Sequence, residues 1–342
     1  MMPIGIRVDA NEKIAMGHLM RCMSIAKCLK SKREKVIFWI SGGYASDFIR
    51  ENGFECNELE YDYCSKEEEV NTLIDSLKHK SVDKLLIDSY QVTQKYMEQL
   101  HSDFQIIYLD DMNAFGYPAD LIINYTYNVS KKIYEKWKYA ETTKFLLGRE
   151  YVPLRSQFKN VMIDTTMPVD TILITTGGAD EQNMIFEILH RLSGSRYKGI
   201  QKIVVAGKFY SHMEELKKTA EKDETIQIYY NVNNMAELMK KSNIAISAGG
   251  TTLAELCACG MPIICFAVAD NQLYGTQAYA KDGIAAYAGD VRESRENVLN
   301  SIVRTVEEMI NDMSLRTQFG NRAHKMIDGN GAERIAERIL QM

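Results

Sequence analysis

Short apolar runs alternate with segments of helical periodicity along most of this 342-residue chain, and this alternation restricts its fold more than any other feature. Residues 35–40, 83–90 and 105–109 are apolar strands of the first half, and the pattern restarts with a strand at residues 170–175. Continuous apolar strands of this length are typical of parallel sheets that are covered on both faces. We therefore predict an α/β fold of two doubly wound, Rossmann-like lobes with right-handed crossovers.

The alternation lapses between about residues 144 and 169, which we interpret as the connection between the lobes. A chain of this length is sufficient for two domains, each with its own core. We predict an N-terminal α/β lobe at residues 1–150, an interlobe connection at residues 151–169 and a C-terminal α/β lobe with a helical tail at residues 170–342. The tail is nearly all helical from residue 294, and one of its helices can reach back to the first lobe.

Composition excludes several classes of protein. The chain is 46% hydrophobic and 25% charged, as in globular rather than disordered proteins. Its net charge is −5, and its 41 basic residues are scattered, so nucleic acid and anionic membranes are not expected partners. The longest apolar run, residues 261–269, is too short to span a bilayer, and the N-terminus lacks a basic segment followed by an apolar one. We expect a cytoplasmic protein with no membrane span.

The cysteines and histidines give no sign of a metal site. None of the seven cysteines forms a C-x-x-C motif, and most lie in apolar periodic segments, as reduced packing thiols do. The six histidines form neither an H-x-x-x-H nor an H-E-x-x-H pair. We expect no metal and no cofactor.

One histidine stands at the end of the first predicted strand. The strand at residues 5–8 runs through a polar turn into a helix that begins near Gly17, so His18 lies in the first helical turn. Strand ends of open α/β sheets form the ligand crevice, and the positive end of a helix favours the neutral imidazole that a general base needs. The polar strand ends at residues 88–90 and 110–111 should line the same edge. The alternative is that His18 only caps the helix or packs, which is the commoner role of a lone histidine.

The second half contains two glycine turns at strand ends, Thr176-Gly177-Gly178 and Ser247-Ala248-Gly249-Gly250-Thr251-Thr252. Glycine lets the backbone approach a ligand closely, and the helix that follows directs N–H groups at an anion. Each turn alone is a weak signal, because glycine pairs are also common in plain turns. Neither turn has the G-x-G-x-x-G or G-x-x-x-x-G-K-[ST] spacing, which argues against a dinucleotide cofactor and P-loop chemistry.

Two further polar groups follow the second glycine turn. Glu255 lies one helical turn after it among apolar neighbours, and it could hold a ribose diol or simply be a favourable charge in a first helical turn. Asp270-Asn271-Gln272 ends the next strand and adds amide groups at the same edge.

The pattern G-G-T-T-L-x-E-x-x-x-x-G-x-P, followed by an apolar strand and D-x-Q, resembles the nucleotide-binding lobe of the MurG-like GT-B superfamily. Together with R-x-D…G-H-x-x-R-C at the N-terminus, it resembles the PseG family, UDP-2,4-diacetamido-2,4,6-trideoxy-β-L-altropyranose hydrolases of pseudaminic acid biosynthesis, and related spore-coat polysaccharide proteins. The resemblance covers roughly residues 4–290. It implies a GT-B-like chain with two lobes facing across a cleft. It also implies a metal-independent hydrolase in which water attacks the anomeric carbon, UDP leaves and the configuration inverts.

The resemblance also assigns residues. It makes His18 the general base, which favours the catalytic over the packing role, and it adds Asp9, Tyr90 and Asn271 to the catalytic group. The residues expected to bind the sugar and UDP are Arg7, Gly17, Arg21, Asp110, Asp111, Gly177, Gly178, Asp180, Gly249, Gly250, Thr251, Thr252, Glu255 and Gln272. Asp9 could orient His18, hold Arg7 or Arg21, or bind a sugar amide. Many family members carry I-G-x-G-H, whereas this chain has Ala15 at the first glycine, which would be strained if that position needs a positive φ.

Three functions follow, of which hydrolysis of a UDP-sugar is the leading one. A glycosyltransferase of the same fold would use an acceptor hydroxyl in place of water. A non-catalytic sugar-nucleotide-binding protein of surface or spore-coat polysaccharide assembly would bind UDP without turnover. In each case the expected partner is a UDP-sugar, and the pattern of residues leaves its stereochemistry, its N-acyl groups and the oligomeric state open.

Overall fold

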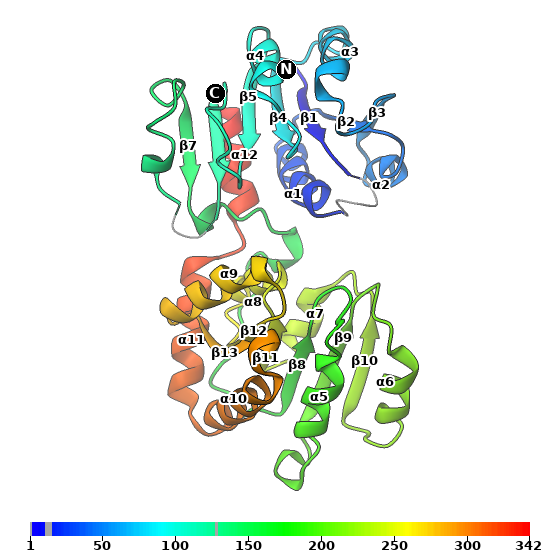
Figure 1. Cartoon of the computed structure of the whole chain (residues 1–342), viewed down its shortest axis with the longest axis vertical. Helices are drawn as coiled ribbons and strands as arrows, with labels where there is room; N and C mark the ends of the chain where they lie inside the picture. The colour runs from blue at the N-terminus through cyan, green and yellow to red at the C-terminus, as the bar shows by residue number, and fades with distance from the viewer. Residues whose placement is uncertain (1, 11–15, 127–128) are drawn as a thin grey trace. The chain divides into compact units, whose positions relative to one another are not determined.

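The computed structural model describes residues 2–10, 16–126 and 129–342, and the chain divides into two compact units. Unit 1 comprises the residues up to Arg155 together with Asn330–Met342, and unit 2 comprises Ser156–Gly329. Each unit has a parallel sheet with helices packed on it (Figure 1). Ala15, for which strain was considered, lies outside the described residues.

Unit 1 is built on a seven-stranded sheet in the order β3-β2-β1-β4-β5-β6-β7, with all strands parallel. The strands are β1 (Ile4–Val8), β2 (Val36–Ser41), β3 (Glu55–Leu59), β4 (Lys84–Asp88), β5 (Gln105–Leu109), β6 (Leu121–Asn124) and β7 (Lys144–Leu147). The helices are α1 (Gly17–Ser31), α2 (Ser46–Glu51), α3 (Lys66–His79), α4 (Gln94–His101) and α12 (Gly331–Leu340). β1 connects to β2 on one side, whereas β4 connects to β5 on the other, so the connections diverge between β1 and β4.

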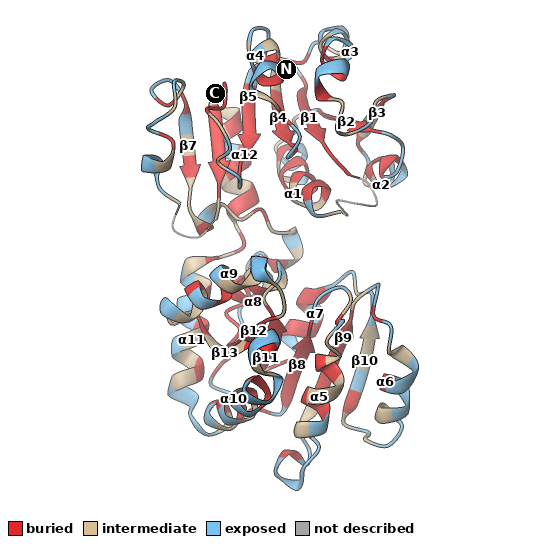
Figure 2. Cartoon of the chain, in the orientation of Figure 1, coloured by how far each residue is buried: buried red, intermediate tan, exposed pale blue. Residues whose placement is uncertain are grey.

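The unit 1 sheet is buried on both faces because its strands are apolar on both faces (Figure 2). In β2, Val36, Phe38 and Ile40 join the core beneath α1, α2 and α12, while Ile37 and Trp39 join the core beneath α3 and α4. This division follows the two-residue period of a strand. The continuous apolar runs of the sequence therefore correspond to doubly covered parallel strands, as predicted.

The last helix of the chain, α12, belongs to unit 1 and packs against α1. Ile335 and Ile339 of α12 are fully buried in the same core as Leu19 and Ile25 of α1. Residues 330–342 therefore depart from the predicted C-terminal lobe of residues 170–342. The physical reason is that the apolar face of α12 packs on α1 and buries apolar side chains of that helix. A helix of the tail therefore packs on the first lobe, as was considered from the sequence.

Unit 2 has a six-stranded parallel sheet in the order β10-β9-β8-β11-β12-β13. The strands are β8 (Thr171–Thr175), β9 (Gln201–Ala206), β10 (Ile226–Tyr230), β11 (Ile244–Ala248), β12 (Ile263–Ala267) and β13 (Ala285–Asp290). The helices are α5 (Met184–Arg191), α6 (Met213–Ala220), α7 (Met235–Lys240), α8 (Thr252–Ala258), α9 (Asp270–Lys281), α10 (Val291–Asn311) and α11 (Met313–Met326). The connections diverge between β8 and β11, the equivalent of β1 and β4 in unit 1.

Two strands were not predicted. β7 lies within the N-terminal lobe predicted at residues 1–150, at the point where the alternation lapses, and Lys144–Leu147 pairs with β6. β7 has only four residues, too few to establish a period. β13 has the sequence AAYAGD, which lacks β-branched residues, and its pairing with β12 makes it a strand.

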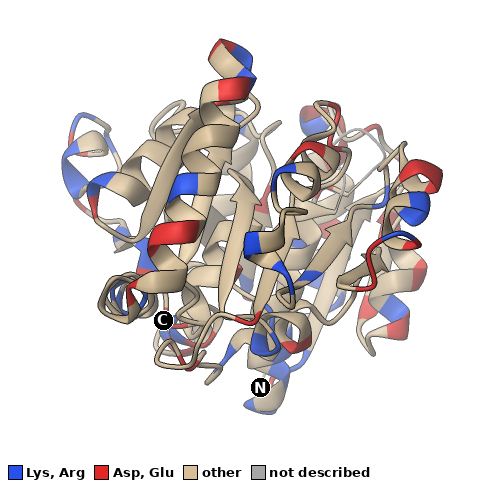
Figure 3. Ribbon diagram, turned by 90° about the horizontal axis from the view of Figure 1, so that it is seen from below, with Lys and Arg blue, Asp and Glu red and all other residues tan. Residues whose placement is uncertain are grey.

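Charged residues of both signs are intermingled over the face drawn in Figure 3, in agreement with their scattering along the sequence. Among the helices of the described residues, none combines the length and apolar character needed to cross a bilayer.

Candidate active site

His18 lies in the first turn of α1, directly after Gly17, beside the carboxyl end of β4. It is only 7% exposed, and its ring meets that of Tyr90 edge-on, with centroids 4.4 Å apart and planes at 81°. His18 Nδ1 is 3.6 Å from Oδ1 of Asp88, the last residue of β4. Asp88 is the register partner of Val8 at the end of β1. His18 thus lies at the point of divergence in the sheet, where ligands bind in open α/β folds.

Arg21, one turn after His18, holds two carboxylates in place. Its Nε and Nη2 donate to Asp88 at 2.5 Å each, and its Nη1 donates to Tyr125 Oη at 2.7 Å and to Asp111 Oδ2 at 3.1 Å. Burial lowers the pKa of Arg21, but the hydrogen bond and the charge of Asp88 raise it by a larger amount. The pKa of Arg21 therefore lies well above its usual value. Arg21 is therefore a permanent cation, and these four bonds support the site; binding of a ligand by Arg21 stays a prediction.

A buried ion cluster, made of Arg7, Asp9, Lys66, Glu69 and Tyr96, lies beneath the same edge of the sheet. Arg7 Nε and Nη2 donate to the two carboxylate oxygens of Glu69 at 2.9 Å each, and Tyr96 Oη donates to Glu69 Oε1 at 2.9 Å. Asp9 Oδ1 is 2.9 Å from both Arg7 Nη1 and Lys66 Nζ. Arg7 is fully buried and anchors Asp9, and its predicted contact with a ligand stays a prediction.

The cluster keeps Asp9 ionised. Burial raises the pKa of Asp9, but the positive charges of Arg7 and Lys66 lower it by more, so the net shift is downward. Lys66 has a lowered pKa, because burial and the charge of Arg7 outweigh its two acidic neighbours. Of the three roles considered for Asp9, the bond with Arg7 is present in the structure, and binding of a sugar amide stays a prediction.

Asp110 and Asp111 have different functions although they are adjacent. Asp110 Oδ1 accepts hydrogen bonds from the backbone N–H groups of Met112 and Asn113 at 2.9 Å, and its Oδ2 accepts from Tyr134 Oη at 2.5 Å. Asp110 therefore shapes the loop after β5. Asp111 is the residue that this loop brings to the site.

Tyr90 donates its hydroxyl hydrogen to Asp111 Oδ2 at 2.7 Å. Burial and the hydrogen bond to Asp111 both raise the pKa of Tyr90, so its hydroxyl stays protonated. The residue is still 44% exposed. Tyr90 can therefore contact a ligand through its ring, but its hydroxyl hydrogen is already committed.

Within the part of the chain that the structure describes, three buried polar atoms at this edge have no hydrogen-bond partner: Asp9 Oδ2, His18 Nδ1 and Asp111 Oδ1. Buried polar atoms are normally paired, because an unpaired one loses its hydration without compensation. Their location around the ends of β1, β4 and β5 is typical of a site that receives a polar ligand or water.

The two predicted glycine turns of unit 2 meet at its point of divergence, because β8 and β11 are adjacent and each ends in one of them. Gly177 has φ +90°, which a residue with a side chain rarely adopts. At Gly249, a Cβ would lie 2.5 Å from Thr276 Cγ2 and 2.9 Å from Gln272 Cβ, so α9 can pack closely only on glycine. Gly178 lies beside the loop after β9, where its carbonyl accepts from Phe209 N at 3.0 Å.

The second turn offers fewer amide donors than its sequence indicates. Gly249 N donates to Phe266 O at 2.9 Å, and Gly250 N donates to Ala248 O at 2.8 Å. Leu253 N and Ala254 N also donate, to Gly250 O and Thr251 O at 3.1 Å each, so an anion at this turn would have to be held by the amide groups of Thr251 and Thr252.

Asp180 is a helix cap. Its two carboxylate oxygens accept from the N–H groups of Met184 and Ile185 at 2.9 Å each, in the first turn of α5. Burial raises the pKa of Asp180 by more than these two bonds lower it. Both oxygens therefore serve the helix, which explains this residue without the ligand that the sequence predicted.

The remaining predicted residues lie on α8 and α9. Thr252 begins α8, and Glu255 is half-buried in the same helix. Asn271 is exposed in the first turn of α9, whereas Gln272 Oε1 accepts from Val268 N at 3.0 Å. Asn271 is thus open to a ligand, while the acceptor oxygen of Gln272 ties α9 to the end of β12.

Sequence reasoning gave no individual role to four residues that build these edges: Asp88, Lys66, Glu69 and Gly207. Asp88 ends a predicted strand, which was a usable signal. Lys66 and Glu69 belong to an acidic run that resembles a solvated helix face, and no pattern revealed their burial. Gly207 is a single glycine after β9, and only the structure reveals that it touches the Gly177-Gly178 turn.

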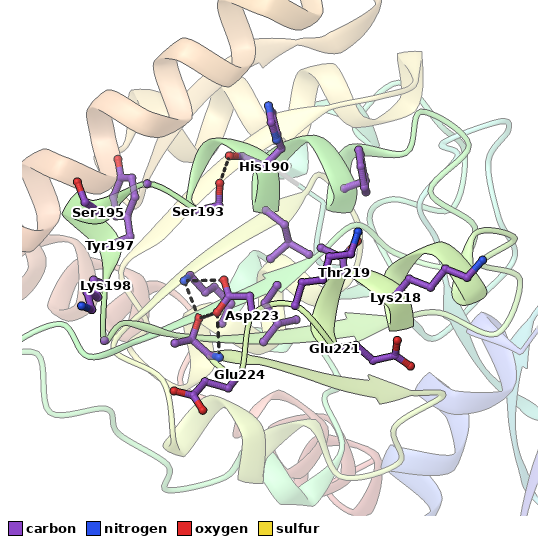
Figure 4. A pocket seen from close by; sticks show the side chains of 18 of the residues that line it. His190, Ser193, Ser195, Tyr197, Lys198, Lys218, Thr219, Glu221, Asp223 and Glu224 are labelled. Atoms are coloured by element: carbon purple, nitrogen blue, oxygen red, sulfur yellow. Dashed lines mark hydrogen bonds and ion pairs between the residues drawn. The ribbon is translucent and has the colours of Figure 1, made fainter.

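A cavity of about 980 Å³ lies at the opposite edge of the unit 2 sheet, where β9 and β10 begin (Figure 4). Its lining includes His190, Lys198, Lys218, Glu221 and Glu224, charges of both signs. It contains none of the predicted site residues. In open α/β sheets ligands bind at the carboxyl ends of the strands, so this cavity is not the candidate active site.

Comparison with protein families gives a match within the second half of the chain. Residues 171–339 match the family model of the Glycosyltransferase family 28 C-terminal domain. The match begins at the first residue of β8, so it includes both glycine turns and Glu255.

The chain is similar to several curated proteins. It is 24% identical to the spore coat polysaccharide biosynthesis protein SpsG of Bacillus subtilis, over 99% of this chain and 98% of that protein. It is 22% identical to the UDP-2,4-diacetamido-2,4,6-trideoxy-β-L-altropyranose hydrolase of Campylobacter jejuni, over 74% of this chain and 87% of that protein. It is 28% identical to the uncharacterized protein MJ1062 of Methanocaldococcus jannaschii, of which the alignment spans 55%.

Solved structures confirm the predicted fold. Acinetobacter baumannii MurG superimposes with a TM-score of 0.69 at 12% identity, covering 99% of this chain and all of that one. Staphylococcus aureus MnaA, solved with UDP, superimposes with a TM-score of 0.64 at 15% identity, covering 99% and 96%. The chain therefore has the MurG-like GT-B fold.

Proposed function

We propose that the protein hydrolyses a UDP-linked diacetamido-trideoxy hexose at the anomeric C–O bond, releasing UDP and the free sugar with inversion, as a step of pseudaminic acid biosynthesis. The observation that carries the proposal is the nearly buried imidazole of His18, which has one ring nitrogen beside a buried carboxylate at the divergence point of the unit 1 sheet. The C. jejuni relative is a hydrolase of this kind by name.

In the proposed reaction, His18 Nε2 takes a proton from a water molecule whose oxygen forms a bond to the anomeric carbon. The bond from that carbon to the β-phosphate oxygen breaks, and UDP leaves with the electron pair. UDP is already a good leaving group, so positioning of the water and stabilisation of charge are the main tasks of the enzyme. Attack opposite the leaving group inverts the configuration.

In the proposed function, unit 2 binds the nucleotide and unit 1 supplies the catalytic base. The carboxyl edge of unit 2 binds UDP through the turns at Gly177 and Gly249, with Glu255 toward the ribose. The edge of unit 1 supplies His18 as the base, while Tyr90 contacts the sugar. The unpaired acceptors Asp9 Oδ2 and Asp111 Oδ1 suit a ligand rich in hydroxyl and amide N–H groups.

The test is incubation with UDP-2,4-diacetamido-2,4,6-trideoxy-β-L-altropyranose, with UDP measured by chromatography and the sugar anomer by proton NMR. We expect equimolar UDP and inverted free sugar, at the same rate with and without EDTA. Release of UDP only after addition of an acceptor would identify a glycosyltransferase instead. UDP binding without turnover of any UDP-sugar would identify a non-catalytic binding protein.

A substitution at Gly207 tests the nucleotide site separately. A Cβ there would collide with the carbonyl oxygens of Gly177 and Gly178, and backbone atoms cannot yield as a side chain can. We expect Gly207→Ala to weaken UDP binding by about tenfold or more, and to destabilise unit 2 by about 1–3 kcal/mol, as overpacking does. Titration calorimetry with UDP and thermal melting by circular dichroism measure the two effects.

The matched control is Gly194→Ala, since a Cβ at Gly194 meets nothing within 4 Å and its φ is −67°. This variant should bind UDP as the wild type does. If Gly207→Ala also retains wild-type affinity, the Gly177-Gly178 turn is not part of the UDP site.

A further inference from the structure

Asp88 is held rigidly at the end of β4 and is fully buried. Arg21 contacts both of its oxygens at 2.5 Å, and Cys22 Sγ is 3.5 Å from Oδ2. Arg21 and Cys22 both lie on α1, the helix that carries His18. A carboxylate that is hydrogen-bonded at both oxygens cannot rotate. The distance from Asp88 to the imidazole is therefore set by the positions of α1, which carries Arg21 and His18, and of β4, which carries Asp88.

The ring of His18 is equally constrained. Tyr90 packs edge-on against it, and Nδ1 is buried without a hydrogen bond, with Asp88 Oδ1 at 3.6 Å as its acidic neighbour. An ionised carboxylate can only accept hydrogen bonds. The tautomer that suits this pairing carries its hydrogen on Nδ1, which leaves the lone pair on Nε2.

Several titratable or charged groups of the described residues lie around this pair. Arg21 is the cation, Asp111 and Tyr125 share its Nη1, Tyr90 is bonded to Asp111, and the thiol of Cys22 faces Asp88. The thiol and the two phenols have raised pKa values, with burial the largest cause of each, so all three stay neutral. Of these described groups, those that carry charge beside the imidazole are therefore Asp88, Arg21 and Asp111.

We infer that Asp88 is a positioning residue of the reaction, which holds the Nδ1–H tautomer of His18 and stabilises the imidazolium formed when Nε2 takes the proton from water. This inference rests on the proposed function and names a residue that the sequence did not assign. Asp88 is buried behind the imidazole and acts only through it. Arg21 orients Asp88 through both carboxylate oxygens, and Asp88 in turn orients His18, as the third member of nucleophile–base arrangements does for its base.

The experiment combines NMR and kinetics. Long-range ¹H–¹⁵N spectra give the tautomer of each imidazole, and the His18 signals are those absent from His18→Ala. We expect Nδ1–H in the wild type and Nε2–H in Asp88→Asn, because the amide can donate to Nδ1. We also expect kcat for UDP release to fall by about 10²-fold or more in Asp88→Asn with little change in KM. In the His18→Ala background, Asp88→Asn should cause no further loss.

Asp120→Asn is the matched control, since Asp120 Oδ2 lies 3.3 Å from Nε2 of the half-exposed His101 in the same unit. It should leave the His18 signals and kcat unchanged. An Nε2–H tautomer in the wild type overturns the inference even if Asp88→Asn does not fold. Equal losses from Asp88→Asn in the wild-type and His18→Ala backgrounds also overturn it. If the wild type releases no UDP, the proposed function fails, while the tautomers still decide the role of Asp88.

Discussion

Replacing His18 by Ala is expected to lower kcat for UDP release by about 10²- to 10⁴-fold, the usual contribution of a positioned general base. The substitution removes the base but leaves the glycine turns of unit 2 intact, so the dissociation constant for UDP should stay within about twofold of the wild-type value. Stopped assays of UDP release and calorimetric titration with UDP measure the two quantities.

His101→Ala is the control for loss of an imidazole from unit 1. His101 ends α4 and pairs with Asp120 at 3.3 Å, away from the carboxyl edge of the sheet. Its loss should leave kcat unchanged. A His18→Ala enzyme that retains more than a tenth of wild-type kcat would refute the general-base assignment.

The second large effect is expected on stability. Replacing Arg7 by Met should lower the free energy of unfolding of unit 1 by about 3–5 kcal/mol, the cost of breaking a buried ion pair. Glu69 would lose two hydrogen bonds, and the carboxylates of Asp9 and Glu69 would share Lys66 as their remaining cation in the buried ion cluster. Urea unfolding followed by tryptophan fluorescence is specific for this unit, because both tryptophans of the chain, Trp39 and Trp137, belong to it.

Lys95→Met supplies the comparison, since Lys95 and Glu67 form an exposed pair at 2.9 Å in the same unit. Exposed pairs contribute about 0–1 kcal/mol, so this variant should unfold almost as the wild type does. Equal unfolding free energies of Arg7→Met and Lys95→Met would contradict the argument.

Acid tests the same cluster by another route. The pKa of Asp9 is lowered below its usual value of 3.8 in the folded state, so its ionisation stabilises the fold above that pH. The stabilisation is lost as the pH falls from 3.8 through the folded-state pKa. The wild type should therefore lose more stability in this range than an Asp9→Asn variant.

The architecture could be predicted from the sequence because each central strand is an unbroken apolar run. The strand predicted at residues 105–109 has the bounds of β5, and the strands predicted at residues 35–40 and 170–175 differ from β2 and β8 by no more than one residue at either end. The short strand β7 and the alanine-rich β13 were missed, because pairing with a neighbour, rather than local composition, makes them strands. The packing of α12 on unit 1 could be considered but not predicted, because the apolar face of a helix does not reveal which surface it packs against.

The residues of the candidate site could be predicted where a polar or titratable side chain lies at or shortly after the carboxyl end of a predicted strand. His18, Tyr90 and Asp111 follow that rule and lie around Asp88 and Arg21. The sequence could not distinguish a residue that meets a ligand from one that supports it. Asp180 caps a helix, Asp110 shapes a loop and Arg7 lies in the core, and these roles depend on burial and hydrogen-bond partners that come only with tertiary structure.

The attachment of α12 to unit 1 also has a consequence for the order of folding during synthesis. All of unit 2 leaves the ribosome before α12, so unit 2 can fold as a continuous segment while unit 1 still lacks its last helix. Until residues 330–342 emerge, α1 exposes the apolar face that Ile335 and Ile339 later cover. The helix that carries His18 thus reaches its final packing last, and a nascent chain would acquire a folded unit 2 before a completed unit 1.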